Sequence, residues 1–147
     1  MTTSDRPDVR NGAGRSRAAA DVVELSIPVR ADLVVLARLT AATVASRSGF
    51  DVEEIEDLRL AVDELCVSLV GEGSEGRLAL RFVRADDDIE VTCTYHPESD
   101  QDVVTTGFSS DELSARILDA LVDEHGMDGG DGNQRIWLRK RRSRPET

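Results

Sequence analysis

The sequence predicts a two-layer α/β sandwich, in which helices cover one face of a mixed β-sheet. Three observations lead to this fold class. Apolar residues recur at helical spacing in three segments, they alternate with polar residues in two adjacent runs, and short apolar runs lie near both ends of the chain. The 147 residues are enough for one domain with a proper core and too few for two comfortable ones.

The first part of the chain predicts a leader, a strand and a helix. Residues 1–20 have no hydrophobic period and are expected to form a disordered leader to a single domain over residues 21–141, which is followed by a basic tail over residues 142–147. The β-branched run 22–27 predicts a strand that ends at Pro28. Residues 32–48 have helical spacing, and Gly49 is placed to end that helix.

A second helix is the most strongly indicated element of the chain. Asp51 and Glu54 have the spacing of a capping box, in which each side chain accepts a hydrogen bond from the other residue's backbone N–H. Glu64 and Ser68 share one face of this helix because residues four apart lie one turn apart. The predicted buried stripe lies on another face and consists of Ile55, Leu58, Val62, Leu65 and Leu69.

The second half of the chain predicts a hairpin, a helix and a closing strand. Residues 78–82 and 89–95 alternate with period two around the turn at residues 86–88. A long connection over residues 96–108 leads to a helix that begins with a capping box of Ser109 and Glu112 and is expected to bury Leu113, Ile117, Leu121 and Val122. Glycines 126, 129, 130 and 132 predict a turn-rich link to a last strand over residues 135–140.

Charge narrows the classes of partner. The net charge of −11 and the isoelectric point of about 4.6 argue against a general nucleic-acid binder and favour a protein partner. Residues 21–134 hold 8 basic and 26 acidic side chains, whereas residues 135–144 hold six basic and no acidic ones. This basic run is either the solvated end of a strand or a contact with an acidic surface, such as the protein's own subunit.

Cysteine and histidine do not form a metal-site pattern. Cys66 and Cys93 lack ligand spacing, and His96 and His125 do not complete a cluster with them, so both thiols are expected to be small core residues in a reducing cytosol. The sequence has no apolar run as long as a membrane span and no signal-peptide segment. We therefore expect a soluble cytoplasmic protein.

The segment Leu60-Ala-Val-Asp-Glu-Leu-Cys66, followed by the hairpin, by Leu121-Val-Asp-Glu124 and by a glycine-rich turn, resembles a known family. Residues 22–141 are similar to anti-sigma regulatory factors of the serine-protein-kinase type, a branch of the Bergerat-fold (GHKL) ATPases, and to the actinobacterial antagonists of stress- or sporulation-type sigma factors in particular. The resemblance implies the histidine-kinase-like ATPase fold and a homodimer.

The resemblance also implies the site residues. Glu64 takes the place of the carboxylate that orients or deprotonates the attacking hydroxyl, and Ser68 takes the place of an asparagine that binds magnesium, which makes it the candidate metal ligand. Tyr95 opens the stretch that matches the adenine-binding motif, and this stretch lacks the motif's acid and both glycines. Ser110 lies where a glycine box precedes the third helix, and the acids that follow it would repel phosphate. These departures predict that ATP binds weakly or not at all, so no cofactor is expected.

Three functions stay open. The resemblance implies an anti-sigma factor that sequesters an alternative sigma factor from RNA polymerase and is countered by an anti-anti-sigma partner of the STAS type, with no contact to nucleic acid or membrane. The alternative is an active ATP-dependent serine-protein kinase that phosphorylates this partner. A third possibility is a structural or sensor subunit unrelated to transcription.

Overall fold

The computed structural model describes residues 21–69, 75–98, 112–129 and 134–143. Several predictions from the sequence lie outside these ranges. They are the disordered leader, most of the long connection with the proposed cap Ser109 and the site residue Ser110, the glycines at 130 and 132, and the end of the basic tail.

One antiparallel sheet forms one of the two layers of the fold, and the helices form the other. Its strands follow the order β1-β2-β3-β5-β4, and their bounds are β1 Asp21–Pro28, β2 Gly76–Ala85, β3 Asp88–Pro97, β4 Glu124–Gly129 and β5 Gln134–Arg141. Every pairing is antiparallel, so the expectation of a mixed sheet is wrong. The reason is β4, because this strand reverses the chain once more before β5 and so brings β5 antiparallel to β3.

Strand β4 also corrects the predicted turn-rich link. Gly126 lies within the strand and pairs with Trp137 of β5. A Cβ atom on Gly126 would come within 3.0 Å of the Trp137 indole. The glycine therefore permits a close approach of side chain to backbone and does not make a turn.

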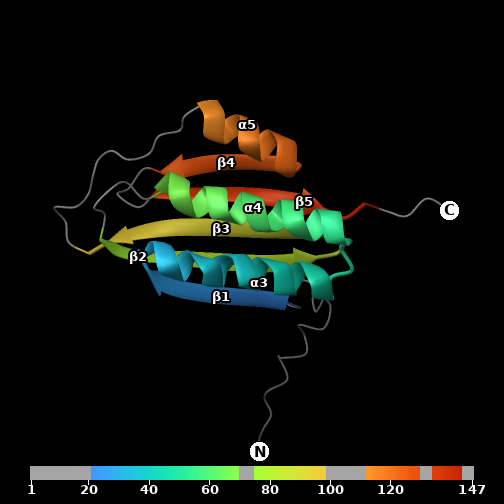
Figure 1. The fold of residues 1–147 in the computed structure, drawn as a ribbon, viewed down its shortest axis with the longest axis horizontal. Coiled ribbons are helices and arrows are strands. Elements are labelled where there is room, and N and C mark those ends of the chain that lie inside the picture. Colours follow the sequence, from blue (N-terminus) through green and yellow to red (C-terminus); the bar gives the residue numbers. More distant parts are fainter. Residues whose placement is uncertain (1–20, 70–74, 99–111, 130–133, 144–147) are drawn as a thin grey trace, which may run out of the picture.

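All helices lie on one face of the sheet, which confirms the two-layer sandwich (Figure 1). A short 3₁₀ turn, η2 Ala31–Leu33, leads into α3 Val34–Arg47, which lies over β1 and β2. Helix α4 Val52–Leu69 lies over β3 and β5, and α5 Glu112–Leu121 lies near the β4 edge. No helix in the described ranges is long and apolar enough to cross a membrane.

The predicted boundaries of the first two helices are confirmed. Gly49 follows α3 with φ of +84°, the left-handed conformation that a helix end often requires. At the start of α4, the Asp51 N–H donates to Glu54 Oε1 at 2.9 Å, and the Glu54 N–H donates to Asp51 Oδ1 at 2.8 Å. The capping box is thus present in both directions.

The core fills the space between the helices and the sheet. Four of the five predicted stripe residues of α4 are buried and Ile55 is half-buried. In α5 the prediction is wrong at Leu113, which is 65% exposed, whereas Leu118 is buried. Since α5 packs against α4 and the sheet edge, the face that carries Ser114 and Leu118, four residues apart, turns inward.

Candidate functional site

Three polar side chains meet between α4 and α5. The Ser114 hydroxyl donates to Glu64 Oε2 at 2.6 Å, and the Ser68 hydroxyl donates to Ser114 Oγ at 3.4 Å. All three residues are partly buried. We call Glu64, Ser68 and Ser114 the interhelix network. The arrangement agrees with the prediction that Glu64 and Ser68 share a face away from the buried stripe of α4.

Ser114 is the member of this network that was not among the predicted site residues. A stripe through Leu113 places Ser114 on the outer side of α5, and the actual inward face runs through Ser114 and Leu118. The four-residue spacing of Ser114 and Leu118 is compatible with this face, but the sequence alone does not choose it over the stripe through Leu113.

The side chains of the network offer few ligands for magnesium and a triphosphate. They supply one carboxylate and two hydroxyls, and each of them already bonds to another member. A serine hydroxyl can ligate magnesium, but here both hydroxyls point into the network. In the part of the chain that the structure describes, no group of three His, Cys, Asp or Glu side chains is arranged to hold a metal ion. The fit is poor, because Glu64 Oε2 and the Ser68 hydroxyl would have to give up their bonds with Ser114 before they could bind a metal ion.

The other two predicted site residues are Tyr95 and Ser110. Tyr95 is buried, and its hydroxyl donates to the backbone carbonyl of Glu75 at 2.7 Å, which fastens the residue just before β2 to β3. Ser110 lies outside the described residues. The assignment of Tyr95 and Ser110 to a nucleotide site stays a prediction.

A second constellation joins the end of β5 to three other parts of the fold. Lys140 Nζ donates to the Leu121 carbonyl at 2.8 Å, and the Ser143 N–H donates to Glu54 Oε2 at 2.7 Å. Arg141 and Arg142 pair with acids of the β2–β3 turn region, Arg141 with Asp88 at 3.4 Å and Arg142 with Asp87 at 2.7 Å. We call residues 140–143 with these contacts the C-terminal clasp.

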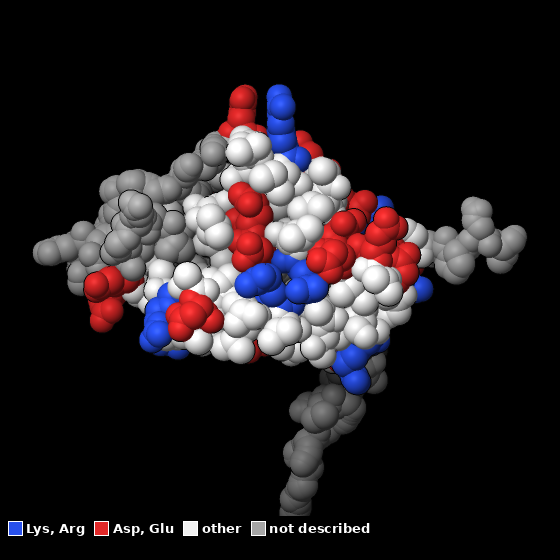
Figure 2. Space-filling model, in the orientation of Figure 1, with Lys and Arg blue, Asp and Glu red and all other residues white. Residues whose placement is uncertain are grey.

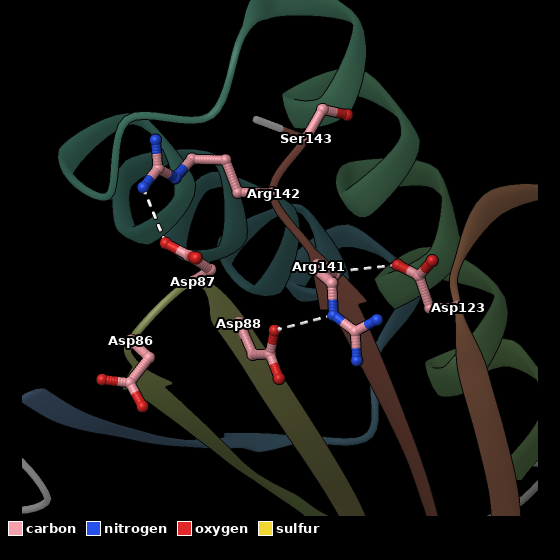
Figure 3. A pocket seen from close by; sticks show the side chains of 7 residues that line it. All are labelled: Asp86, Asp87, Asp88, Asp123, Arg141, Arg142 and Ser143. Carbon is pink, nitrogen blue, oxygen red and sulfur yellow. Dashed lines mark hydrogen bonds and ion pairs between the residues drawn. The ribbon is translucent and has the colours of Figure 1, made fainter. Parts of the chain in front are cut away.

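The clasp borders an open hollow of about 540 Å³ (Figure 3). In this view Asp87 and Asp88 reach toward the two arginines, whereas Asp86 points away from them. The Arg141 N–H also donates to Asp123 Oδ2 at 2.7 Å. Of the two interpretations of the basic run, the described part supports the electrostatic contact, and the acidic surface belongs to the same chain.

Glu54 is the residue of α4 that the C-terminal clasp contacts through Ser143. It is 8% exposed and is the one charged side chain that is buried among the described residues. Burial by itself raises the pKa of Glu54, but the N–H groups of Asp51 and Ser143 and the charge of Lys140 outweigh it and hold that pKa below its usual range. The carboxylate therefore ties the start of α4 to the end of the sheet.

Both thiols are fully buried and free, as expected for small core residues. A hydrogen bond with the Cys66 thiol, together with burial, raises the pKa of Cys93 well above its ordinary value. The histidines are apart from them: His96 is exposed, and His125 Nε2 lies 2.7 Å from Asp119 Oδ1. Among the described residues, these four side chains do not form a group that could hold a metal ion.

An apolar hollow of about 470 Å³ lies between α3 and the edge strand β1. Its lining includes Val23, Leu36 and Leu39, which are 40%, 39% and 54% exposed. An ion pair between Asp21 and Arg84, at 2.7 Å, lies on its rim. Exposed apolar side chains beside a strand edge are typical of a surface that another chain covers.

Comparisons with known proteins identify relatives that match most of the chain. The family model described as "Histidine kinase-like ATPase domain" matches residues 27–140. A serine-protein kinase RsbW from Bacillus pumilus is 30% identical over 131 residues, which are 76% of this chain and 81% of the relative. The serine-protein kinase RsbW from Bacillus subtilis is 33% identical over 122 residues, which are 71% of this chain and 76% of the relative.

A solved structure shares the fold. The crystal structure of the RsbU and RsbW domains of a Mycobacterium tuberculosis protein matches with a TM-score of 0.65 at 18% identity, over 86% of this chain. The match spans only 34% of that longer chain. At this identity the likeness shows the fold alone.

Proposed function

The chain belongs to the histidine kinase-like ATPase domain family, among the RsbW-type serine-protein kinases, and from this premise we propose that it is an anti-sigma factor. It binds an alternative sigma factor in the cytoplasm, keeps it from RNA polymerase, and releases it when an anti-anti-sigma partner of the STAS type binds. The family model matches nearly the whole domain. This supports binding of a sigma factor, since the fold that would present the binding surface is retained.

The nucleotide site is degenerate in this proposal. The observation that carries the choice is the interhelix network, in which Glu64 and Ser68, the side chains that would serve phosphoryl transfer, both bond to Ser114. Ser68 has a shorter reach than the asparagine that the family resemblance implies at that position. The alternative function, an active serine-protein kinase that phosphorylates the anti-anti-sigma partner, is favoured by the retained carboxylate of Glu64.

Charge supports a basic protein partner. The chain has a net charge of −11, and acidic side chains gather on the helical face over the start of α4 (Figure 2). Glu53 and Glu56 of the first turns of α4 are exposed. A sigma factor presents basic surfaces for DNA, and an acidic antagonist is steered onto such surfaces by long-range attraction.

We also propose a homodimer that forms through the β1 edge. The hollow between α3 and β1 offers exposed apolar residues next to an edge whose outer backbone groups have no neighbouring strand among the described residues. A second copy would cover both features at once. Light scattering should give a mass near twice 16.0 kDa, and Leu39→Glu should shift it to the monomer. A wild-type monomer at micromolar concentration would contradict the dimer.

The function is tested with purified proteins. The chain is titrated against each alternative sigma factor of its own organism by calorimetry, and then added to transcription reactions with reconstituted holoenzyme. We expect one sigma factor to bind without nucleotide and to lose its transcription. If no sigma factor binds and no reaction is inhibited, the anti-sigma proposal is wrong. Phosphate transfer from Mg-ATP to the anti-anti-sigma partner, lost in Glu64→Gln, would establish the kinase.

A further inference from the structure

We propose that Ser114 is a positioning residue that holds α5 against α4 and bonds to both Glu64 and Ser68, so that neither side chain is free for an incoming hydroxyl or a metal ion. The inference rests on the proposed function because it takes the nucleotide site to be degenerate. It gives a physical cause for that loss. It assigns to one side chain of α5 a control over the candidate catalytic carboxylate of α4.

The distance is the first argument. A separation of 2.6 Å between Ser114 Oγ and Glu64 Oε2 is at the short end for a hydroxyl that donates to a carboxylate, where the charge strengthens the bond. Ser114 Oγ also accepts the bond from Ser68. A hydroxyl has one hydrogen to donate, so Ser114 has none left for another acceptor.

The packing of α5 is the second argument. The helix is short, Glu112–Leu121, and within it Leu118 is the one buried residue. Leu113 is 65% exposed, and the side chains of Ala115 and Arg116 are exposed as well. A helix with so little burial depends strongly on its remaining links, and among the described side-chain hydrogen bonds Ser114 to Glu64 connects its first turns to α4.

The chemistry of the pair is the third argument. A carboxylate in hydrogen-bond contact with a serine hydroxyl is the arrangement that a general base needs toward the hydroxyl it activates. Relatives of this chain are named serine-protein kinases, whose acceptor is a serine hydroxyl. Ser114 therefore occupies on Glu64 the position that an acceptor serine would need, and it does so from within the same chain.

The test compares three variants of the full chain. Ser114→Ala removes the hydroxyl, Ser114→Thr keeps a hydroxyl at the same position, and Leu113→Ala changes the exposed neighbour as a control. Hydrogen exchange of the α5 amides is followed by mass spectrometry. We expect Ser114→Ala to exchange about tenfold faster than the wild type, since one such bond is worth about that factor. Ser114→Thr should restore protection, and Leu113→Ala should leave it unchanged.

A second readout separates positioning from simple stabilisation. A fluorescent ATP analogue with magnesium is titrated into each variant, and we expect Ser114→Ala to bind it at least several-fold more tightly than the wild type and Ser114→Thr. The proposal is overturned if α5 exchange and analogue affinity in Ser114→Ala match the wild type. It is also overturned if Mg-ATP phosphorylates Ser114, because the residue would then be an acceptor. These readouts need no sigma factor, so their failure is distinct from a failure of the anti-sigma proposal.

Discussion

Removal of the Glu54 side chain should destabilise the fold far more than removal of its neighbour Glu53. In the wild type, the N–H groups of Asp51 and Ser143 donate to the Glu54 carboxylate at 2.9 and 2.7 Å. In Glu54→Ala, both groups lose this acceptor. A hydrogen bond to a charged group contributes about 1.5–3 kcal/mol, and a helix cap about 1 kcal/mol. Because the Ser143 bond is of the first kind and the Asp51 bond of the second, we expect a loss of about 2.5–4 kcal/mol in the free energy of unfolding.

Urea denaturation measures this loss, with the fluorescence of Trp137, the one tryptophan of the chain, as the signal. Glu53→Ala is the matched control, since Glu53 is exposed in the same helical turn and should cost less than about 0.5 kcal/mol. Asp51→Ala removes the other half of the cap and should cost about 1 kcal/mol. If Glu54→Ala loses no more than Asp51→Ala, the bond to Ser143 does not stabilise the fold and the role of the C-terminal clasp is wrong.

Three further predictions concern stability and reactivity. The pKa of Glu54 is lowered in the folded chain, so the unfolded chain takes up the proton first, and the free energy of unfolding should fall as the pH drops below about 4.5; Glu54→Gln should flatten that fall in urea titrations across pH. Gly76→Ala should cost about 3 kcal/mol or more in thermal unfolding, because φ is +136° and the new Cβ would lie 2.2 Å from the His96 carbonyl oxygen; Gly49→Ala, with φ of +84° and ordinary contacts, should cost about 1 kcal/mol. Cys66 and Cys93 should react with a thiol reagent only as fast as the chain unfolds, and rapid reaction without denaturant would contradict their burial.

Local signals made α4 and the hairpin predictable. The capping box of Asp51 and Glu54 spans three residues, and both of its hydrogen bonds are present. The hairpin joins strands with alternating residues through a short turn, in which Asp86 has φ of 55°. Signals of this kind depend on neighbours in the sequence, and tertiary packing does not alter them.

Where packing decides between equal patterns, the sequence could not choose. Leu113 and Leu118 both fit an apolar stripe on α5, and the contact with α4 selects the face of Leu118 and Ser114. The sequence around Gly126 predicts a turn, but in the structure the glycine lies in a strand and the Trp137 indole packs against it. The hydrogen bond between Glu54 and Ser143 joins residues 89 positions apart, and no local sequence pattern predicts such a contact.

The candidate site was predicted in part for the same reason. Glu64 and Ser68 follow from helical spacing on one element, and the structure brings them together as expected. Ser114 comes from another helix, whose rotation is set by tertiary contacts. The loss of nucleotide contacts is what the resemblance implies, and it stays a prediction.

We propose that the scaffold binds a sigma factor without the help of a nucleotide. Calorimetric titration of the sigma factor into the chain, with and without millimolar Mg-ATP, tests it most directly. We expect equal affinity in the two titrations and no saturable heat from Mg-ATP alone. Binding of the sigma factor only in the presence of Mg-ATP, with the nucleotide effect abolished by Glu64→Ala, would contradict it.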